Sequence, residues 1–186
     1  MRNDGSDSRL EFVGYTPVAI GLHWVVVLLL FVQYIIGWTM PAIHRGTQPG
    51  TLINLHLSFG ALILITLLVR LAWRMTHRAP PPPAGLPGWQ NQASALVHGL
   101  LYLLLIAIPV LGWMNASARG WTVTLFGLIP LFPLTAEGSA VGRASGDVHA
   151  TLSYVLLGVA ALHVLAALYH RFVLRDEVLQ RMLPGH

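Results

Sequence analysis

The chain contains no cysteine and no lysine, and it has few charged residues of either sign. The absence of cysteine excludes disulfides, iron–sulfur clusters, thiolate zinc sites and covalent haem attachment. Only 10% of the 186 residues are charged and 55% are hydrophobic, whereas a soluble domain has about 25% charged residues. The composition therefore predicts an integral membrane protein.

Four apolar runs each have roughly the 20 residues needed to cross the hydrocarbon core of a bilayer. Pro109 and Gly112 predict a bend in the third run, which is tolerated inside a bundle. The later apolar segment WTVTLFGLIPLFPLT contains two prolines and is short, so we expect it to be interfacial or re-entrant. The expected fold is all-α, an integral membrane four-helix bundle in a single domain over residues 1–186. The predicted spans are residues 18–40, 52–73, 93–114 and 148–172.

The arginines are distributed unequally over the segments that join the spans. Eight lie in the two termini or lead into a Pro-rich linker at about residues 79–88, and three lie in the other two connections. Because positively charged loops stay in the cytoplasm, we expect both termini and the Pro-rich linker to be cytoplasmic. The connection at about residues 115–147 is then an outer loop. This topology explains the net charge of +4, and no nucleic-acid partner is expected.

Nine histidines are unusual in so apolar a chain, and three of them lie within the fourth span. His149, His163 and His170 fall on one stripe of a helix, with about 21 Å between the first two. Ionisable groups that face lipid are penalised by a few kcal/mol. The stripe is therefore expected to face the interior of the bundle.

The direction of each span sorts the intramembrane histidines into two layers. The second and fourth spans enter from outside, which places His56 and His149 in an outer layer. The first and third spans enter from the cytoplasm. The inner layer accordingly has four candidates: His23, His98, His163 and His170.

Facing imidazoles at two levels about 20 Å apart suit two stacked haems in the core of a bundle. Gly60 lies one turn after His56 on the same face and leaves room for a flat macrocycle. For any single histidine the alternative is an interhelical hydrogen bond. Zinc needs three or four ligands at one point, but a haem-free transporter can use two layers as a metal relay. For the histidines in loops and at the chain end we expect solvated side chains: His44, His77 and His186.

Five segments resemble the bacterial cytochrome b561 family over nearly the whole chain after residue 15. They read IGLHWVVVLLLF, LINLHLSFGALILITLLVRL, VHGLLYLLLIAIPVLGWM, VHATLSYVLLGVAALHVLAALYHRF and LRDEVLQRMLP. The resemblance implies a multi-pass protein of the bacterial inner membrane with two non-covalent b-type haems and electron exchange with membrane quinone. It also implies the haem ligands, His23 paired with His163 and His56 paired with His149.

This resemblance leaves His98 and His170 without an assigned role. Two roles stay open for them: hydrogen bonding at the inner membrane surface, or contact with a haem propionate or a quinone head group. Arg70, Arg74 and Arg171 lie at the same membrane face. They either pair with propionates or extend their charged ends toward water.

Haem iron with two histidine ligands has no open position, which favours electron transfer over oxygen binding. We therefore expect electron transfer between a periplasmic donor and membrane quinone. Superoxide is one donor that the resembled family uses, and Arg45, Arg119 and Arg143 are either charges that attract it or ordinary loop arginines. The alternatives are a membrane anchor subunit, docked through residues 115–147 to a separate dehydrogenase or hydrogenase, and a haem-free metal-handling transporter.

Overall fold

The computed structural model describes residues 14–77, 80–81 and 87–184. Its long helices are α1 (Pro17–Thr39), α2 (Thr51–Thr76), α3 (Gly88–Ala118) and α4 (Ala140–Tyr169). The short strands β1 (Thr124–Leu125) and β2 (Ile129–Pro130) precede α4, and the short helical turns η1 (His170–Leu174) and η2 (Gln180–Met182) follow it. Most of the predicted Pro-rich linker lies outside the described residues, as do Arg2, Arg9, Arg78 and His186.

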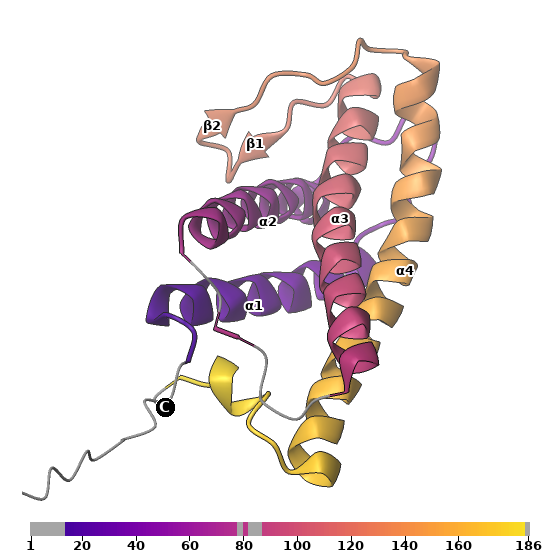
Figure 1. The fold of residues 1–186 in the computed structure, drawn as a ribbon. Helices are drawn as coiled ribbons and strands as arrows, with labels where there is room; N and C mark the ends of the chain where they lie inside the picture. The colour runs from indigo at the N-terminus through magenta and orange to yellow at the C-terminus, as the bar shows by residue number, and fades with distance from the viewer. Residues whose placement is uncertain (1–13, 78–79, 82–86, 185–186) are drawn as a thin grey trace, which may run out of the picture.

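The long helices form two neighbouring pairs. α3 packs along α4, α1 packs along α2, and α2 also contacts α3. Figure 1 shows α3 and α4 running side by side, with the pair formed by α1 and α2 crossing them. All four helices contribute to the main apolar core. Its buried members are Val26, Leu29, Ile63, Leu67, Leu104, Leu105, Ile108 and Leu156.

All four long helices have the length and apolar composition needed to cross a membrane. Their outward faces carry exposed apolar side chains such as Leu28 (62% exposed), Phe31 (65%) and Leu103 (62%). Such faces are unfavourable in water and favourable against lipid. The predicted four-helix membrane fold is therefore confirmed.

α3 and α4 extend beyond the apolar runs that predicted them. α3 continues to Ala118 and α4 begins at Ala140, which shortens their connection to residues 119–139. The Ser139 hydroxyl accepts a hydrogen bond from the Gly142 amide at 3.2 Å and caps the start of α4. Hydropathy does not detect these extra turns, because their residues are mainly small or polar.

The apolar segment between α3 and α4 forms a β-hairpin that contacts α2. Ser58 of α2 holds its turn. The hydroxyl of Ser58 hydrogen-bonds to the Thr124 carbonyl at 2.8 Å and accepts from the Phe126 amide at 3.1 Å. The hairpin therefore lies over α2 at Ser58, two residues after His56, and Figure 1 shows it above this helix.

After α4 the chain turns back toward α1. His170 Nδ1 lies 2.5 Å from the Asp176 carboxylate, at the turn that ends the long helix. The indole of Trp24 in α1 donates a hydrogen bond to the Met182 carbonyl at 2.7 Å. The C-terminal segment, yellow in Figure 1, consequently lies beside the end of α1 at which that helix begins.

Candidate functional site

Five of the six intramembrane histidines come together in two groups. His56 of α2 and His149 of α4, which we call the outer pair, have ring centres 5.9 Å apart. In the inner group, the ring centre of His163 of α4 lies 6.4 Å from that of His23 of α1 and 5.2 Å from that of His98 of α3. α4 therefore contributes one histidine to each group, as the stripe in its sequence predicts.

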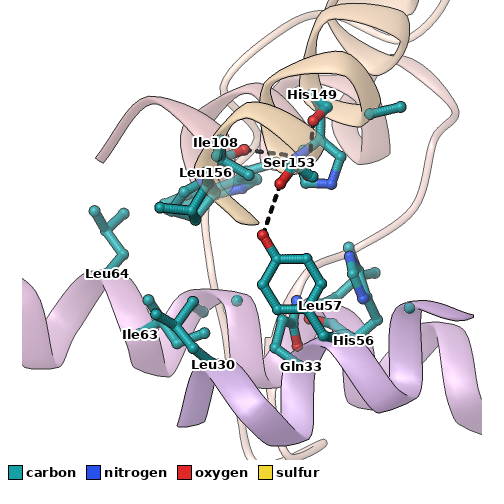
Figure 2. Close-up of a pocket in the computed structure, with 18 of the residues that line it drawn as sticks. Leu30, Gln33, His56, Leu57, Ile63, Leu64, Ile108, His149, Ser153 and Leu156 are labelled. Carbon is teal, nitrogen blue, oxygen red and sulfur yellow. Dashed lines mark hydrogen bonds between the residues drawn. The ribbon is translucent and has the colours of Figure 1, made fainter. Parts of the chain in front are cut away.

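The outer pair lines a cavity of about 220 Å³ between the two helix pairs. Figure 2 shows His149 and Ser153 of α4 facing the helices that carry His56 and Gln33. Leu30, Tyr34, Leu105, Ile108, Trp113 and Leu156 also line this cavity. Mainly apolar walls with a few convergent polar groups are typical of a cofactor site.

Glycines remove side chains from the walls of this cavity at Gly37, Gly60 and Gly112. A β-carbon on Gly37 would lie 3.6 Å from His56 Cε1, and one on Gly112 would lie 2.9 Å from His149 Nδ1. Both histidine rings thus pack against helix backbone. This arrangement leaves the space between the rings open for a flat ligand.

Some polar atoms around the outer pair have hydrogen-bond partners and others have none among the described residues. His149 Nδ1 lies 2.8 Å from the Ile108 carbonyl oxygen, which can only accept, so Nδ1 carries the proton and Nε2 keeps a free lone pair. Among the described residues, no partner bonds His56 Nδ1, Gln33 Oε1 or Trp113 Nε1, although all three atoms are buried. Buried polar atoms without partners indicate a site shaped for a bound group.

The spacing of the paired imidazoles fits a metal held from opposite sides. An imidazole nitrogen ligates a metal at about 2 Å and lies about 1 Å from its own ring centre, so two such rings have centres about 6 Å apart. The separations of 5.9 Å for His56–His149 and 6.4 Å for His23–His163 match this value better than 5.2 Å for His98–His163. Within the described ranges, no group of three or more His, Asp or Glu side chains is able to hold an ion. The geometry therefore fits histidine pairs on either side of a planar cofactor.

Arg70 joins three helices beside the inner group. Its guanidinium donates to the Tyr102 hydroxyl at 3.2 Å and to the Ala19 carbonyl at 2.9 Å. Arg74, one turn later, lies over the Tyr102 ring, 5.8 Å from its centre. Since a guanidinium has five donors, Arg70 retains donors for an anionic group.

His170 and Arg171 lie in η1, where both contact the C-terminal segment. His170 pairs with Asp176, and Arg171 lies beside the side-chain amide of Gln180. The sequence gives no signal for these contacts, because they depend on the π-helical turn that reverses the chain. These contacts join both residues to the C-terminal segment.

Among the three outer arginines, Arg119 is fixed by its neighbours. Its Nε donates to Asn115 Oδ1 at 2.9 Å, and a terminal nitrogen donates to the His44 carbonyl at 3.2 Å. Arg45 and Arg143 are exposed. Arg119 thus joins two of the outer connections, whereas Arg45 and Arg143 extend toward the surface.

Known proteins resemble this chain over nearly its whole length. The family model described as prokaryotic cytochrome b561 matches residues 14–185. Cytochrome b561 homolog 2 of Escherichia coli (strain K12) is 28% identical over 173 residues, which cover 91% of this chain and 90% of the relative. Probable superoxide oxidase CybB of Yersinia pestis is 32% identical over 180 residues, covering 91% of this chain and 96% of the relative. Cytochrome b562 of Cereibacter sphaeroides is 31% identical over 175 residues, covering 91% and 95% respectively. The chain therefore belongs to the prokaryotic cytochrome b561 family, as a multi-pass protein of the bacterial inner membrane that binds haem b and transfers electrons.

Proposed function

We propose that this cytochrome holds two haems and passes electrons between a donor outside the cytoplasm and membrane quinone. The observation that carries the proposal is the presence of two histidine pairs at ligand spacing, His56 with His149 and His23 with His163. His149 and His163 lie on one continuous helix, about 21 Å apart along its axis. Two cofactors at these levels bridge most of a hydrocarbon core about 30 Å thick.

In this proposal, His56 and His149 ligate the outer haem, and His23 and His163 ligate the inner one. Haem supplies a reversible one-electron change at its iron. Two histidine ligands would leave the iron no open position for oxygen, so the bound haem would serve electron transfer. The apolar walls of the outer cavity exclude water, and Gly37 and Gly112 let the rings of the outer pair pack against the helices.

The inner group is the proposed end for quinone. A quinone takes up two electrons and two protons, so its site needs proton-exchanging groups beside a cofactor. His98 is not required as a ligand, and its Nδ1 lies 2.7 Å from the Ser94 carbonyl, which leaves Nε2 for proton exchange. Arg70 and Arg74 carry positive charge suited to a haem propionate or a quinone oxygen.

Both termini are proposed to lie in the cytoplasm. The support is the distribution of the arginines, eight of which lie at one membrane face and three at the other. The inner group and the C-terminal segment are then at the cytoplasmic face. The outer pair and the β-hairpin are at the periplasmic face.

Superoxide is the proposed donor at the outer pair. One relative, from Yersinia pestis, is named a probable superoxide oxidase, and the exposed Arg45 and Arg143 provide positive charge on the outer connections. Two superoxide ions each release one electron and leave as oxygen. One quinone takes both electrons together with two protons and becomes quinol.

The purified protein tests this proposal in two steps. Pyridine haemochrome analysis is expected to give two haems b per chain, extractable by acid acetone because no cysteine attaches them. One haem or none per chain contradicts the di-haem proposal. Superoxide added to the oxidised protein in liposomes with quinone should then reduce haem and quinone without any other protein. Haem reduction only in the presence of a dehydrogenase or hydrogenase would favour the anchor-subunit alternative.

A further inference from the structure

We infer that Gly112 is a positioning residue: its missing side chain admits the His149 ring to the Ile108 carbonyl, which fixes the orientation and the tautomer of that ring. The inference rests on the proposed role of His149 as an outer haem ligand. It goes further by assigning the control of this ligand to α3, a helix that supplies no proposed ligand of its own.

The first step is steric. A β-carbon on Gly112 would lie 2.9 Å from His149 Nδ1 and 3.0 Å from His149 Cε1. Real β-carbons essentially never lie less than 3.0 Å from another heavy atom, so the 2.9 Å contact with Nδ1 is not tolerated. Any side chain at position 112 must therefore displace the imidazole.

The second step concerns the acceptor. Ile108 and Gly112 are four residues apart on α3 and lie on one face of that helix. The Ile108 carbonyl has two lone pairs, so it can accept from His149 Nδ1 at 2.8 Å in addition to its helical hydrogen bond. A side chain at position 112 would stand between this carbonyl and the ring on α4.

The third step is that α3 and α4 are packed closely and joined by a hydrogen bond next to His149. A β-carbon on Gly142 would lie 2.6 Å from the Ala118 β-carbon, and one on Gly146 would lie 2.6 Å from Asn115 Nδ2. Asn115 also donates to the Gly142 carbonyl at 3.0 Å. The two helices are thus in close contact directly beside His149, and the ring has to turn or shift within the cavity.

The chemical consequence follows from the hydrogen bond. An imidazole whose Nδ1–H is bonded to a carbonyl is a more basic ligand through Nε2, and it favours the oxidised metal. His56 has no such contact, because its Nδ1 has no hydrogen-bond partner among the described residues. Gly112 therefore lowers the reduction potential at the outer pair through His149 alone.

Gly112→Ala is the decisive variant, and Gly158→Ala is its matched control. Gly158 lies on α4 as His149 does, and a β-carbon there meets nothing within 4 Å. For Gly112→Ala we expect either loss of one haem per chain, or two haems of which one has a more positive midpoint potential and altered low-spin EPR g-values. Gly158→Ala should match the parent protein. Two haems with unchanged potentials and g-values in Gly112→Ala would overturn the inference.

A second measurement does not depend on the folding of a variant. In the reduced, diamagnetic parent protein labelled with [¹⁵N]histidine, NMR should show an Nδ1 proton on both histidines. The proton of His149 should have the downfield chemical shift of a hydrogen bond, and the proton of His56 should lack this shift. Absence of the downfield shift on His149 overturns the inference. Failure of the proposed function has a different signature, namely a parent protein without two haems, or a His149→Ala variant that keeps both.

Discussion

The two histidine groups differ in how completely their surroundings specify a ligand. The outer pair has two members, one of them hydrogen-bonded to a backbone carbonyl, in a cavity with glycines in its walls. The inner group has a third histidine, His98, and lies within electrostatic range of Arg70. Only the inner group thus combines surplus proton-exchanging and charged groups with a histidine pair. This difference suits a cofactor site at one end and a site for cofactor, protons and quinone at the other.

The largest expected effect concerns which histidine group faces the cytoplasm, because a phosphatase fusion is either active or inactive. Alkaline phosphatase fused to the C-terminus is expected to be inactive in cells, because the proposed topology, based on the arginine distribution, places that end in the cytoplasm. A phosphatase inserted in the outer connection near residue 137 should be active. An active C-terminal fusion would reverse the assignment of inner and outer.

Removing a ligand of the outer pair should remove one haem completely. His56→Ala and His149→Ala are each expected to lower the ratio from two haems per chain to one, since the outer pair contains no third histidine. Haem quantification and redox titration of the purified variants measure this loss. If either variant retained two low-spin haems, the outer pair would not be the ligand set.

The inner group should respond more variably, because it has a spare histidine. His23→Ala and His163→Ala are expected to lose the inner haem, whereas His98→Ala should keep both haems and slow quinone-dependent reoxidation by about 10²-fold or more. The His98 variant tests the ligand assignment most directly, because the His98 ring lies closer to the His163 ring than the His23 ring does. Loss of a haem in His98→Ala with none in His23→Ala would exchange their roles.

The smallest effect is expected at the C-terminal turn. His170→Ala and Asp176→Asn each disrupt one partly exposed hydrogen bond, which is worth about 1 kcal/mol. We expect both variants to keep two haems, with a slightly lower melting temperature. His170→Ala should also slow quinone reoxidation modestly, by disturbing the segment whose Met182 carbonyl accepts a hydrogen bond from Trp24, the residue after His23. Identical kinetics in both variants and the parent would remove any quinone role from this turn.

The sequence predicts the four membrane-spanning helices well, because a long apolar run with few charges is a direct signal of a span. It predicts the surroundings of the histidines poorly. The role of the Ile108 carbonyl has no signature in the sequence, since every residue has the same backbone acceptor. The sequence predicts the hairpin held by Ser58 only as an interfacial or re-entrant apolar segment, because two-residue strands leave almost no pattern. The closeness of His98 to His163 depends on helix rotation, which hydropathy does not report.

Each histidine group takes one member from α4 and the others from helices that precede it in the chain. α4 follows the other three long helices in the chain, so a nascent chain that lacks it contains neither histidine pair. With the proposed ligands, haem binding would therefore have to follow the insertion of α4. Once bound, each haem would tie α4 to α1 or α2, which connects the two helix pairs and stabilises the assembled form by mass action.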